Sequence, residues 1–235
     1  MPLPEFDGHT VDFWHGQLSG DEAVSQHYLP LLDAAELARA KTLANPLIRR
    51  RFIEVRGRLR GVLADTLKQN PAAIRIARTE YGKPYLADHP QFAFNISHTA
   101  NQLAIVVAPS CQLGVDIEHI QARANLAALV AKCFSATEAA YWQALPDAEK
   151  TSVFYQFWTK KEAFVKATGR GIALGLQHCV VNPQQPEAFL GVPEGYGVAE
   201  AWRAISLDLP TMDKPLCAAL VLDKRQVLIR RFRLD

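Results

Sequence analysis

The sequence has few cysteines and no long apolar run. The four cysteines form no C-x-x-C pair, which argues against a zinc site or a thioredoxin-like motif. No apolar stretch approaches the roughly 20 residues that span a bilayer, and residues 1–5 show neither segment of a secretory signal. We therefore expect a cytoplasmic protein, not bound to a membrane, with buried free thiols. The cysteines are Cys111, Cys133, Cys179 and Cys217.

The chain also lacks a strong net charge. Its 26 basic and 24 acidic side chains give +2 at pH 7, so we expect no nucleic-acid partner for the arginine-rich stretch 49–60. With 49% hydrophobic and 21% charged residues, the composition is that of an ordinary globular protein. The length allows one large domain or two of about 100–150 residues. No Gly/Ser linker is present, so we expect two closely packed halves, 1–110 and 111–235.

Hydrophobic periodicity predicts a mixed α/β fold. Helical patterns occur at 34–67, 126–133, 136–144 and 153–168. The first has Asp33 as a candidate N-cap and a break near Asn45 and Pro46. Strand patterns occur at 71–78, 91–97, 103–108, 113–118, 216–222 and 226–234. The strands at 103–108 and 113–118 are expected to be neighbours in a meander.

The stretch 157–166, FWTKKEAFVK, is the most unusual part of the chain. At about 100° per residue, Lys161 projects into an apolar stripe, whereas Glu162 and Lys166 follow its edge. An ordinary amphipathic helix with a Glu-to-Lys pair, worth about 0.2–0.5 kcal/mol, is one interpretation. A lysine is almost never fully buried without a partner, so Lys161 favours a helix that borders a cleft. The stripe consists of Phe154, Phe157, Trp158, Phe164 and Val165.

Two carboxylates alternate along one predicted strand. Asp116 and Glu118 leave the same face, while Val115 and Ile117 point into the core. Like charges on one face repel unless a cation lies between them, and Mg²⁺ would satisfy both while retaining waters and phosphate oxygens as ligands. The same pattern also occurs on ordinary exposed strands. A metal site needs a third ligand, and Glu162 is the candidate.

Other polar groups could meet a phosphate. Ser97 and His98 end a strand with a hydroxyl and an imidazole, although a histidine at a strand end is commonly an ordinary surface residue. Lys83 lies in a Gly-Lys-Pro turn, either as a solvated lysine or as a point charge for phosphate. Most arginines at 49–60 are expected to be solvated, and one or two could clamp a phosphate bidentately.

Four motifs together resemble the 4′-phosphopantetheinyl transferases of the Sfp type, in that family's order. They are GKP at 82–84, FNISH at 94–98, GVDIE at 114–118 and WTKKEAFVK at 158–166. The length favours this type over the short, trimeric carrier-protein synthases. The resemblance implies a monomer of two similar α/β halves related by a pseudo-twofold axis. It places coenzyme A and Mg²⁺ in the cleft between them.

The resemblance also implies a reaction. The serine of an apo acyl or peptidyl carrier protein attacks the β-phosphate of coenzyme A, takes the phosphopantetheine arm and releases adenosine 3′,5′-bisphosphate. The implied Mg²⁺ ligands are Asp116, Glu118 and Glu162. Glu162 is also the preferred base, directly or through a metal-bound water, and His98 and Lys166 complete the catalytic group. The implied coenzyme A contacts are Arg51, Lys83, Ser97, His98, Lys161 and Lys166.

The sequence allows alternatives for two residues and for the activity. Arg49 or Arg50 could replace Arg51 as the 3′-phosphate clamp. Glu138 stands where some family members carry a further acidic residue proposed as a base, but it also forms a capping-box pattern with Ser135. A Mg²⁺-dependent phosphohydrolase and a non-catalytic module that binds coenzyme A or carrier protein are the competing activities.

The expected partner is a carrier-protein domain of fatty-acid, polyketide or nonribosomal-peptide synthesis. It should dock on an exposed apolar surface near the cleft, to which Phe134 and Tyr141 are candidate contributors.

Overall fold

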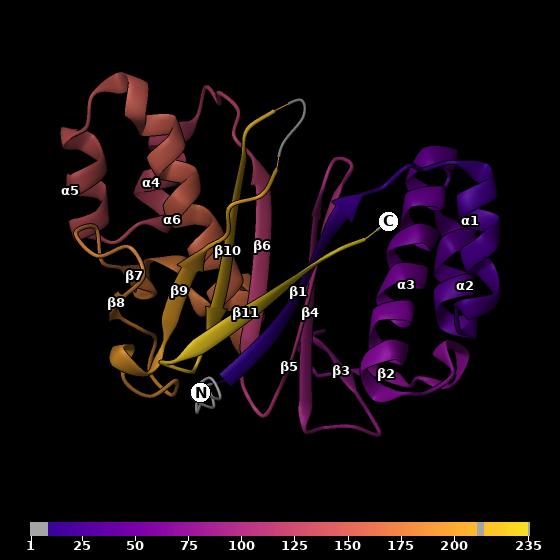
Figure 1. Cartoon of the computed structure of the whole chain (residues 1–235). Helices are drawn as coiled ribbons and strands as arrows, with labels where there is room; N and C mark the ends of the chain where they lie inside the picture. Colours follow the sequence, from indigo (N-terminus) through magenta and orange to yellow (C-terminus); the bar gives the residue numbers. More distant parts are fainter. Residues whose placement is uncertain (1–8, 211–213, 235) are drawn as a thin grey trace, which may run out of the picture.

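The computed structural model describes residues 9–210 and 214–234 and has the predicted mixed α/β fold. Its α-helices are α1 (Glu22–Tyr28), α2 (Ala34–Thr42), α3 (Pro46–Leu67), α4 (Leu126–Cys133), α5 (Ala136–Ala144) and α6 (Asp147–Thr168). Figure 1 shows α1, α2 and α3 at one side and α4, α5 and α6 at the other, with the strands between them. None of the helices in the described ranges is long and apolar enough to cross a membrane.

The strands form two main sheets and two short pairs. Their bounds are β1 (His9–Gln17), β2 (Ile76–Arg78), β3 (Pro84–Leu86), β4 (Phe92–Thr99), β5 (Gln102–Pro109), β6 (Leu113–His119), β7 (Val180–Val181), β8 (Phe189–Gly191), β9 (Arg203–Ser206), β10 (Leu216–Leu222) and β11 (Val227–Arg233). The main sheets have the orders β11-β1-β5-β4 and β6-β10-β9. β11 runs parallel to β1, so strands from near both chain ends share one sheet (Figure 1).

Most predicted elements are confirmed. The break before Pro46 separates α2 from α3, where Asn45 accepts hydrogen bonds from the first N–H groups of α3. Asp33 forms a capping box with Glu36 at the start of α2. α6 begins earlier than predicted and ends at Gly169, whose φ of 74° is left-handed. β1 and α1 were not among the predicted elements.

The predicted meander of 103–108 and 113–118 is wrong, because β6 does not pair with β5. β4 and β5 are antiparallel neighbours, but β6 pairs with β10 and forms the edge of its own sheet. In an antiparallel pair, each residue directs its N–H and its C=O group to the same side of the strand. On an edge strand, alternate residues therefore direct these groups to a side where no strand of the same sheet accepts or donates a hydrogen bond. The N–H of Val115 donates instead to Asn95 Oδ1 at 3.0 Å, and that of Ile117 to Ser97 Oγ at 3.2 Å.

We call this junction the seam: Asn95 and Ser97 of β4 with Val115 and Ile117 of β6. It joins the edges of the two sheets through side chains and not through a backbone ladder. Side chains alternate along β4, since Phe94 packs on the opposite face, in the core beneath α3. The seam therefore turns two open sheet edges into one interior.

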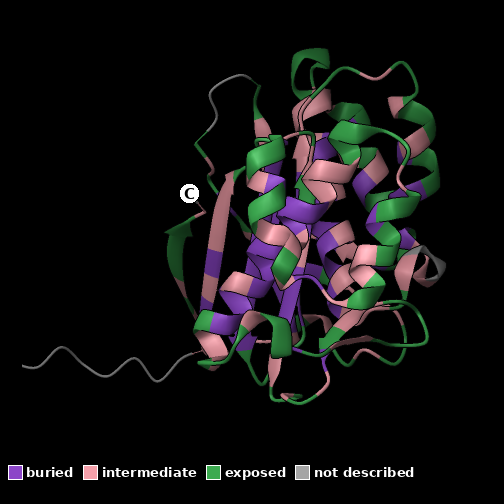
Figure 2. Cartoon of the chain, turned by 90° about the vertical axis from the view of Figure 1, so that its right-hand side faces the viewer, coloured by how far each residue is buried: buried purple, intermediate pink, exposed green. Residues whose placement is uncertain are grey.

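Three layers of apolar side chains surround the seam. Val115 and Ile117 lie in the core between the two sheets, as predicted. The stripe of α6 is also largely confirmed, with Phe154, Phe157 and Phe164 buried against α4, α5 and the second sheet. Buried residues run through the middle of the molecule, and exposed residues cover the outer sides of the helices (Figure 2).

Phe134 does not belong to an exposed surface, contrary to expectation. It is 5% exposed and stacks on Phe154 with ring centroids 5.6 Å apart. Tyr141 is half-buried and contacts Phe157. Both rings therefore stabilise the core around α6.

A glycine brings β6 into direct contact with α6. A Cβ atom at Gly114 would lie 2.1 Å from Ala163 O and 2.5 Å from Ala167 N, far closer than non-bonded atoms approach. Only a residue without a side chain fits here. The close contact sets Asp116, two residues along the same face, opposite Lys166 of the helix.

Lys161 is paired inside the C-terminal part of the core. Its side chain is fully buried, and its Nζ lies 2.7 Å from Glu138 Oε2 and donates to the carbonyls of Leu176 and Cys179. All three donors of the ammonium group are used. The expectation that Lys161 faces a bound phosphate is therefore corrected: it is buried because a carboxylate is buried with it.

Glu138 does more than cap its helix. The predicted capping box with Ser135 is confirmed, and the second carboxylate oxygen accepts from the N–H of Val181 at 2.8 Å. With Lys161, this carboxylate ties α5, α6 and β7 together. Such a saturated, buried group has no room for the role of a base.

All four cysteines are free thiols, as predicted. Cys133 and Cys179 are buried, but Cys111 and Cys217 are only half-buried. Burial raises the pKa of Cys111 to about 12 and the pKa of Cys217 above its usual value. None of these thiols is therefore prepared to act as a nucleophile at neutral pH.

Replacing Gly114 with alanine should destabilise the fold. The added methyl group meets the backbone of α6, and overpacking of this kind costs about 1–3 kcal/mol. Urea unfolding measures the loss. Gly61→Ala is the matched control, because no atom lies within 4 Å of its Cβ position; in mid-helix it should gain about 0.5–1 kcal/mol. An unchanged midpoint for Gly114→Ala would refute the close contact.

Replacing Lys161 with methionine should lower the free energy of unfolding by about 3–5 kcal/mol, because it leaves the Glu138 carboxylate buried and unpaired. The neighbouring Lys160 is the control. It is 2% exposed, burial lowers its pKa, and it has no ion pair within the described ranges. Lys160→Met should therefore be neutral or stabilising. Equal effects of the two substitutions on thermal or urea unfolding would contradict the assignment.

Candidate active site

A serine, an aspartate and a lysine meet at the seam. Ser97 Oγ donates to Asp116 Oδ1 at 3.0 Å, and Lys166 Nζ lies 2.7 Å from the same oxygen. Lys166 also donates to Ser97 Oγ at 2.9 Å and to Val115 O at 3.1 Å. Ser97 thus uses its single donor and both lone pairs, since the N–H of Ile117 takes the other. The arrangement fixes the Asp116 carboxylate rigidly.

Three carboxylates interact beside this group. Burial and the charge of Asp116 raise the pKa of Glu118, whose Oε2 accepts a long hydrogen bond from Thr99 Oγ1 at 3.4 Å. Burial raises the pKa of Glu162 as well, followed by the charges of Asp116 and Glu118. The three carboxylates therefore repel one another across the space between β6 and α6. This is the like-charge cost that the sequence predicted.

The donor set fits a hard divalent cation. Asp116 Oδ2 is buried and has no hydrogen-bond partner within residues 9–210 and 214–234. A cation next to that oxygen would satisfy it and relieve the repulsion that raises the pKa of Glu118 and Glu162. In the described residues, however, no group of three or more His, Cys, Asp or Glu side chains is arranged so that it could hold a metal ion. Carboxylate oxygens are the type of ligand that Mg²⁺ prefers, and Asp116 Oδ2 is the buried oxygen that lacks a partner.

A cationic pocket of 280 Å³ opens next to Lys166. Its lining comes from α3, the Gly-Lys-Pro turn, β4 and the C-terminal end of α6, with Asn95 and Lys166 shared with the seam and its lysine. Its cations are Arg56, Arg78, Lys83 and Lys166. No aspartate or glutamate is among the lining residues, so the pocket suits an anion.

Lys83 is held against the C-terminal end of α6. Its Nζ donates to the carbonyl of Ala167, near the end of α6, and its stem packs where a Cβ of Gly169 would stand. Burial lowers its pKa to about 8. A lysine that is half-buried without a carboxylate partner gains from a bound anion, which would raise its pKa again.

The arginines of α3 fall into two groups by their contacts. We predicted that most of them are solvated, and this prediction is wrong. Arg58 pairs with Glu54 at 2.9 Å, and the fully buried Arg60 pairs with Asp33 at 2.6 Å. Such pairs fix the N-terminal helices and leave no role in binding. Arg49 and Arg50 are likewise used locally, on the carbonyls of Leu43 and Gly20.

Arg51 and Arg56 form the second group. Arg51 donates to Ala100 O in the β4–β5 turn at 3.2 Å, and its Nε is buried without a partner in the described part of the chain. Arg56 Nε is also buried without a hydrogen bond there; it lies 3.9 Å from Glu36 Oε1 in a long ion pair, and burial lowers the pKa of Arg56. Of the three adjacent arginines, the contacts of Arg51 thus favour it as the anion clamp. The sequence did not single out Arg56 among the arginines at 49–60.

His98 follows Ser97 on the exposed side of β4. Partial burial lowers its pKa, and the charges of Lys166 and Arg56 lower it further, so the imidazole is mostly neutral at pH 7. The structure thus brings Ser97, Asp116 and Lys166 into contact, and places Glu118, Glu162, Lys83 and His98 around them. Lys161 lies apart from this group.

Comparison with known proteins places these motifs in one family. Residues 112–220 match the model described as the 4′-phosphopantetheinyl transferase superfamily, and residues 48–110 match its N-terminal counterpart. The chain is 34% identical over 203 residues to the 4′-phosphopantetheinyl transferase HetI of Nostoc, covering 84% of this chain and 82% of HetI.

Two further relatives agree with this match. Sfp of Bacillus subtilis is 34% identical over 128 residues, which cover 54% of this chain and 55% of Sfp. AcpT of Escherichia coli K12 is 36% identical over 110 residues, covering 47% of this chain and 55% of AcpT. The chain therefore belongs to the 4′-phosphopantetheinyl transferase superfamily and is an enzyme of that class.

Proposed function

We propose that the chain transfers the 4′-phosphopantetheine arm of coenzyme A to a serine of an apo acyl or peptidyl carrier protein. The reaction depends on Mg²⁺ and releases adenosine 3′,5′-bisphosphate. The observation that carries the proposal is the row of Asp116, Glu118 and Glu162 next to Lys166 and a cationic pocket. An acidic metal site beside a basic pocket suits a diphosphate substrate. The proposal includes a monomeric, cytoplasmic enzyme of two similar halves, 1–110 and 111–235.

Asp116, Glu118 and Glu162 are the proposed Mg²⁺ ligands, Glu118 directly or through water. When bound, Mg²⁺ supplies positive charge to the diphosphate and to the developing charge of the leaving group. The buried, unpartnered Asp116 Oδ2 supports this assignment. Ser97 and Lys166 hold the other oxygen of Asp116, so Oδ2 is the atom left for the metal.

The cationic pocket is the proposed site for the adenosine and phosphates of coenzyme A. Lys83 and Arg56 would meet phosphate or the adenine edge, Arg51 the 3′-phosphate, and Ser97 and His98 the diphosphate. Their support is a buried guanidinium Nε without a hydrogen bond in each arginine, although that of Arg56 lies 3.9 Å from Glu36, and a lysine whose pKa is lowered by burial. Lys166 already uses its three donors, so contact with phosphate requires it to exchange one partner.

Glu162 is the proposed base for the carrier serine. It is half-buried, and no hydrogen bond or ion pair of its carboxylate occurs within the described residues. Burial and the charges of Asp116 and Glu118 raise the pKa of this carboxyl group, and the charge of Lys166 offsets only part of the rise. A metal ligand on the open side of α6 could thus accept the serine proton itself or through a metal-bound water.

Transfer to a carrier protein is tested by mass spectrometry. The protein, coenzyme A, Mg²⁺ and an apo carrier protein should yield a carrier with the mass of the phosphopantetheine arm added. Several carriers from fatty-acid, polyketide and nonribosomal-peptide synthesis identify the preferred partner. Absence of the mass gain on all of them would refute the proposal. Hydrolysis of coenzyme A without a carrier would indicate a phosphohydrolase, and binding without turnover a non-catalytic module.

Removing one carboxylate should abolish transfer without unfolding the protein. We expect Glu162→Gln and Asp116→Asn to lower the transfer rate by at least about a hundredfold, as loss of a metal ligand does, with the Mg²⁺ requirement shifted upward. Glu149→Gln is the control, because Glu149 is exposed on the first turn of the same helix. Near-normal turnover of Glu162→Gln at limiting Mg²⁺ would contradict its role.

The pKa of Lys83 predicts a pH dependence of coenzyme A binding. An anion binds the protonated ammonium, which is lost above about pH 8. Affinity should therefore fall by up to about tenfold from pH 7 to pH 9. Lys83→Arg keeps its charge and should bind equally at both pH values. Calorimetry measures the affinity at both pH values. The exposed Lys41→Arg is the control and should show the pH dependence of the wild type. If it did not, the pH dependence would have a cause unrelated to Lys83.

A further inference from the structure

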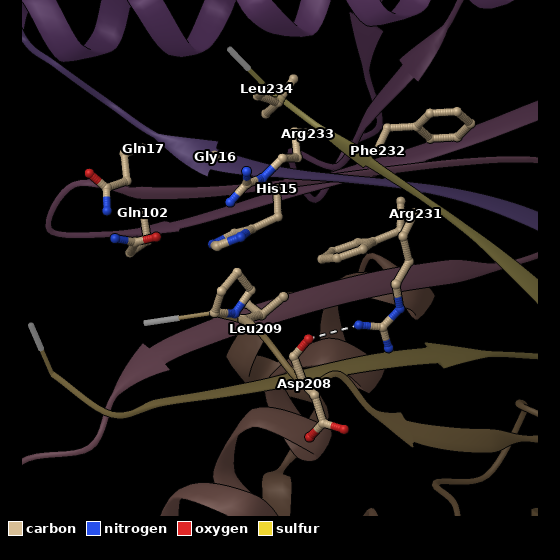
Figure 3. A pocket seen from close by; sticks show the side chains of 12 residues that line it. His15, Gly16, Gln17, Gln102, Asp208, Leu209, Arg231, Phe232, Arg233 and Leu234 are labelled. Carbon is tan, nitrogen blue, oxygen red and sulfur yellow. Dashed lines mark hydrogen bonds between the residues drawn. The ribbon is translucent and has the colours of Figure 1, made fainter. Parts of the chain in front are cut away.

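A second cavity lies at one end of the space between the two sheets (Figure 3). It has a volume of 340 Å³ and shares no lining residue with the pocket beside Lys83. Its walls come from β1, β5, β11 and the segment 208–210 that follows β9. The cavity is therefore separate from the proposed substrate pocket, and the transfer reaction gives it no role.

Two polar side chains reach this cavity with unpartnered atoms. His15 Nε2 and Gln102 Oε1 are buried and form no hydrogen bond within residues 9–210 and 214–234. Gln102 is only 5% exposed, and its amide nitrogen donates to Asn101 Oδ1 at 3.3 Å. Figure 3 shows the amide oxygen and the imidazole on the same side of the cavity. A buried carbonyl oxygen without a donor costs free energy that a ligand hydroxyl would recover.

Two arginines give the cavity a positive charge. Arg231 and Arg233 alternate along β11 and line it. Arg231 donates to the carbonyl of Asp208 at 2.7 Å, while the Asp208 carboxylate points away from the cavity (Figure 3). Neither arginine forms an ion pair in the described part of the chain. Arg230, on the opposite face of the strand, pairs with Asp12 at 2.5 Å.

The imidazole of His15 is a neutral partner in this site. Burial lowers its pKa, the neighbouring side chain of Gln102 opposes this in part, and the charge of Arg233 lowers the pKa further. At neutral pH the ring therefore offers one N–H or one lone pair and adds no charge of its own. Its position next to Arg233 brings a hydrogen-bonding group and a guanidinium to the same small volume.

The remaining walls are apolar. Phe13 is 2% exposed and stacks in parallel on His15, with centroids 6.5 Å apart. Leu209 and Pro210 line the opposite side. Gly16 allows the end of β11 to lie against β1, since a Cβ there would be 2.3 Å from Leu234 O. A ligand would thus meet charge, a hydrogen-bond acceptor and an apolar wall together.

We propose that this cavity binds a small hydroxycarboxylate. Its carboxylate would pair with Arg231 and Arg233, its hydroxyl would donate to Gln102 Oε1 and meet His15, and its apolar part would lie on Phe13 and Leu209. An anion alone would leave Gln102 Oε1 without a donor, and a neutral alcohol would not use the charge of the two arginines, which are exposed at the mouth of the cavity. The proposal concerns binding only and does not depend on the transfer reaction.

Three related probes test the proposal by calorimetry on the full chain: mandelate, phenylacetate, which lacks the hydroxyl, and mandelamide, which lacks the charge. Mandelate should bind, and each analogue should bind about tenfold or more weakly, the loss expected for one strong hydrogen bond or ion pair. Absence of mandelate binding at about 10 mM, or equal affinity for all three probes, would overturn the proposal.

Matched variants locate the site. Arg233→Gln should lower the affinity for mandelate by about tenfold or more. Gln102→Leu should remove the preference for mandelate over phenylacetate. Arg230→Gln, on the same strand but outside the cavity, should bind as the wild type does. Thermal unfolding without ligand shows that each variant is folded. If Arg230→Gln lost as much affinity as Arg233→Gln, binding would reflect general surface charge, and the assignment would be wrong.

Discussion

The fold depends on two sheet edges that meet through side chains. β4 and β6 lie side by side, yet the N–H groups of Val115 and Ile117 are accepted by Asn95 and Ser97 and not by a backbone carbonyl. An edge strand with unsatisfied groups would be costly inside the molecule. The amide and hydroxyl side chains remove that cost and fix the position of one sheet against the other.

The same contact creates the chemistry of the site. A backbone ladder at the seam would leave no position for a polar side chain, whereas here Ser97 reaches both Ile117 and Asp116. Asp116 then takes Lys166 as its second partner, and its other oxygen remains free. The absence of a side chain at Gly114 lets β6 approach α6 closely enough for these bonds. Site and fold therefore share their hydrogen bonds.

The charged side chains on and next to α6 occur in two kinds of environment. Lys161 and Glu138 are both fully buried, and each satisfies the other. The carboxylates of Asp116, Glu118 and Glu162 repel one another, and Lys166, together with Arg123 near Glu118, compensates them only in part. A closed ion pair contributes to packing, while an uncompensated acidic group is suited to binding a cation. This contrast distinguishes the structural charges of the helix from those proposed for catalysis.

Local patterns predicted much of this structure, and long-range partners account for the rest. Caps, helix ends and strand alternation follow from neighbouring residues, so the break at Asn45 and the inward-facing Val115 and Ile117 could be foreseen. The prediction for Lys161 was wrong because its partner Glu138 lies in another helix. The pairing of β6 with β10 and of β1 with β11 joins segments far apart in the chain. Periodicity carries no information about such pairs.

In the candidate site, too, local patterns indicate some residues and only the fold reveals the others. Asp116, Glu118 and Glu162 were proposed from spacing and motif, because their chemistry is local to a strand and a helix. Arg56 could not be singled out among the arginines at 49–60, since only the fold reveals that its Nε is buried without a hydrogen bond. Asn95 belongs to the FNISH motif, but its contact with the backbone of Val115 required the structure.

Amide hydrogen exchange along β6, followed by NMR, tests the seam most directly. In Ser97→Ala, the account predicts that exchange of the Ile117 amide accelerates by about tenfold or more, the effect of losing one hydrogen bond. The Val115 amide, accepted by Asn95, should change much less, and the amides of β10 should keep their protection. Wild-type exchange at Ile117, or equal acceleration of every amide in both strands, would contradict the account.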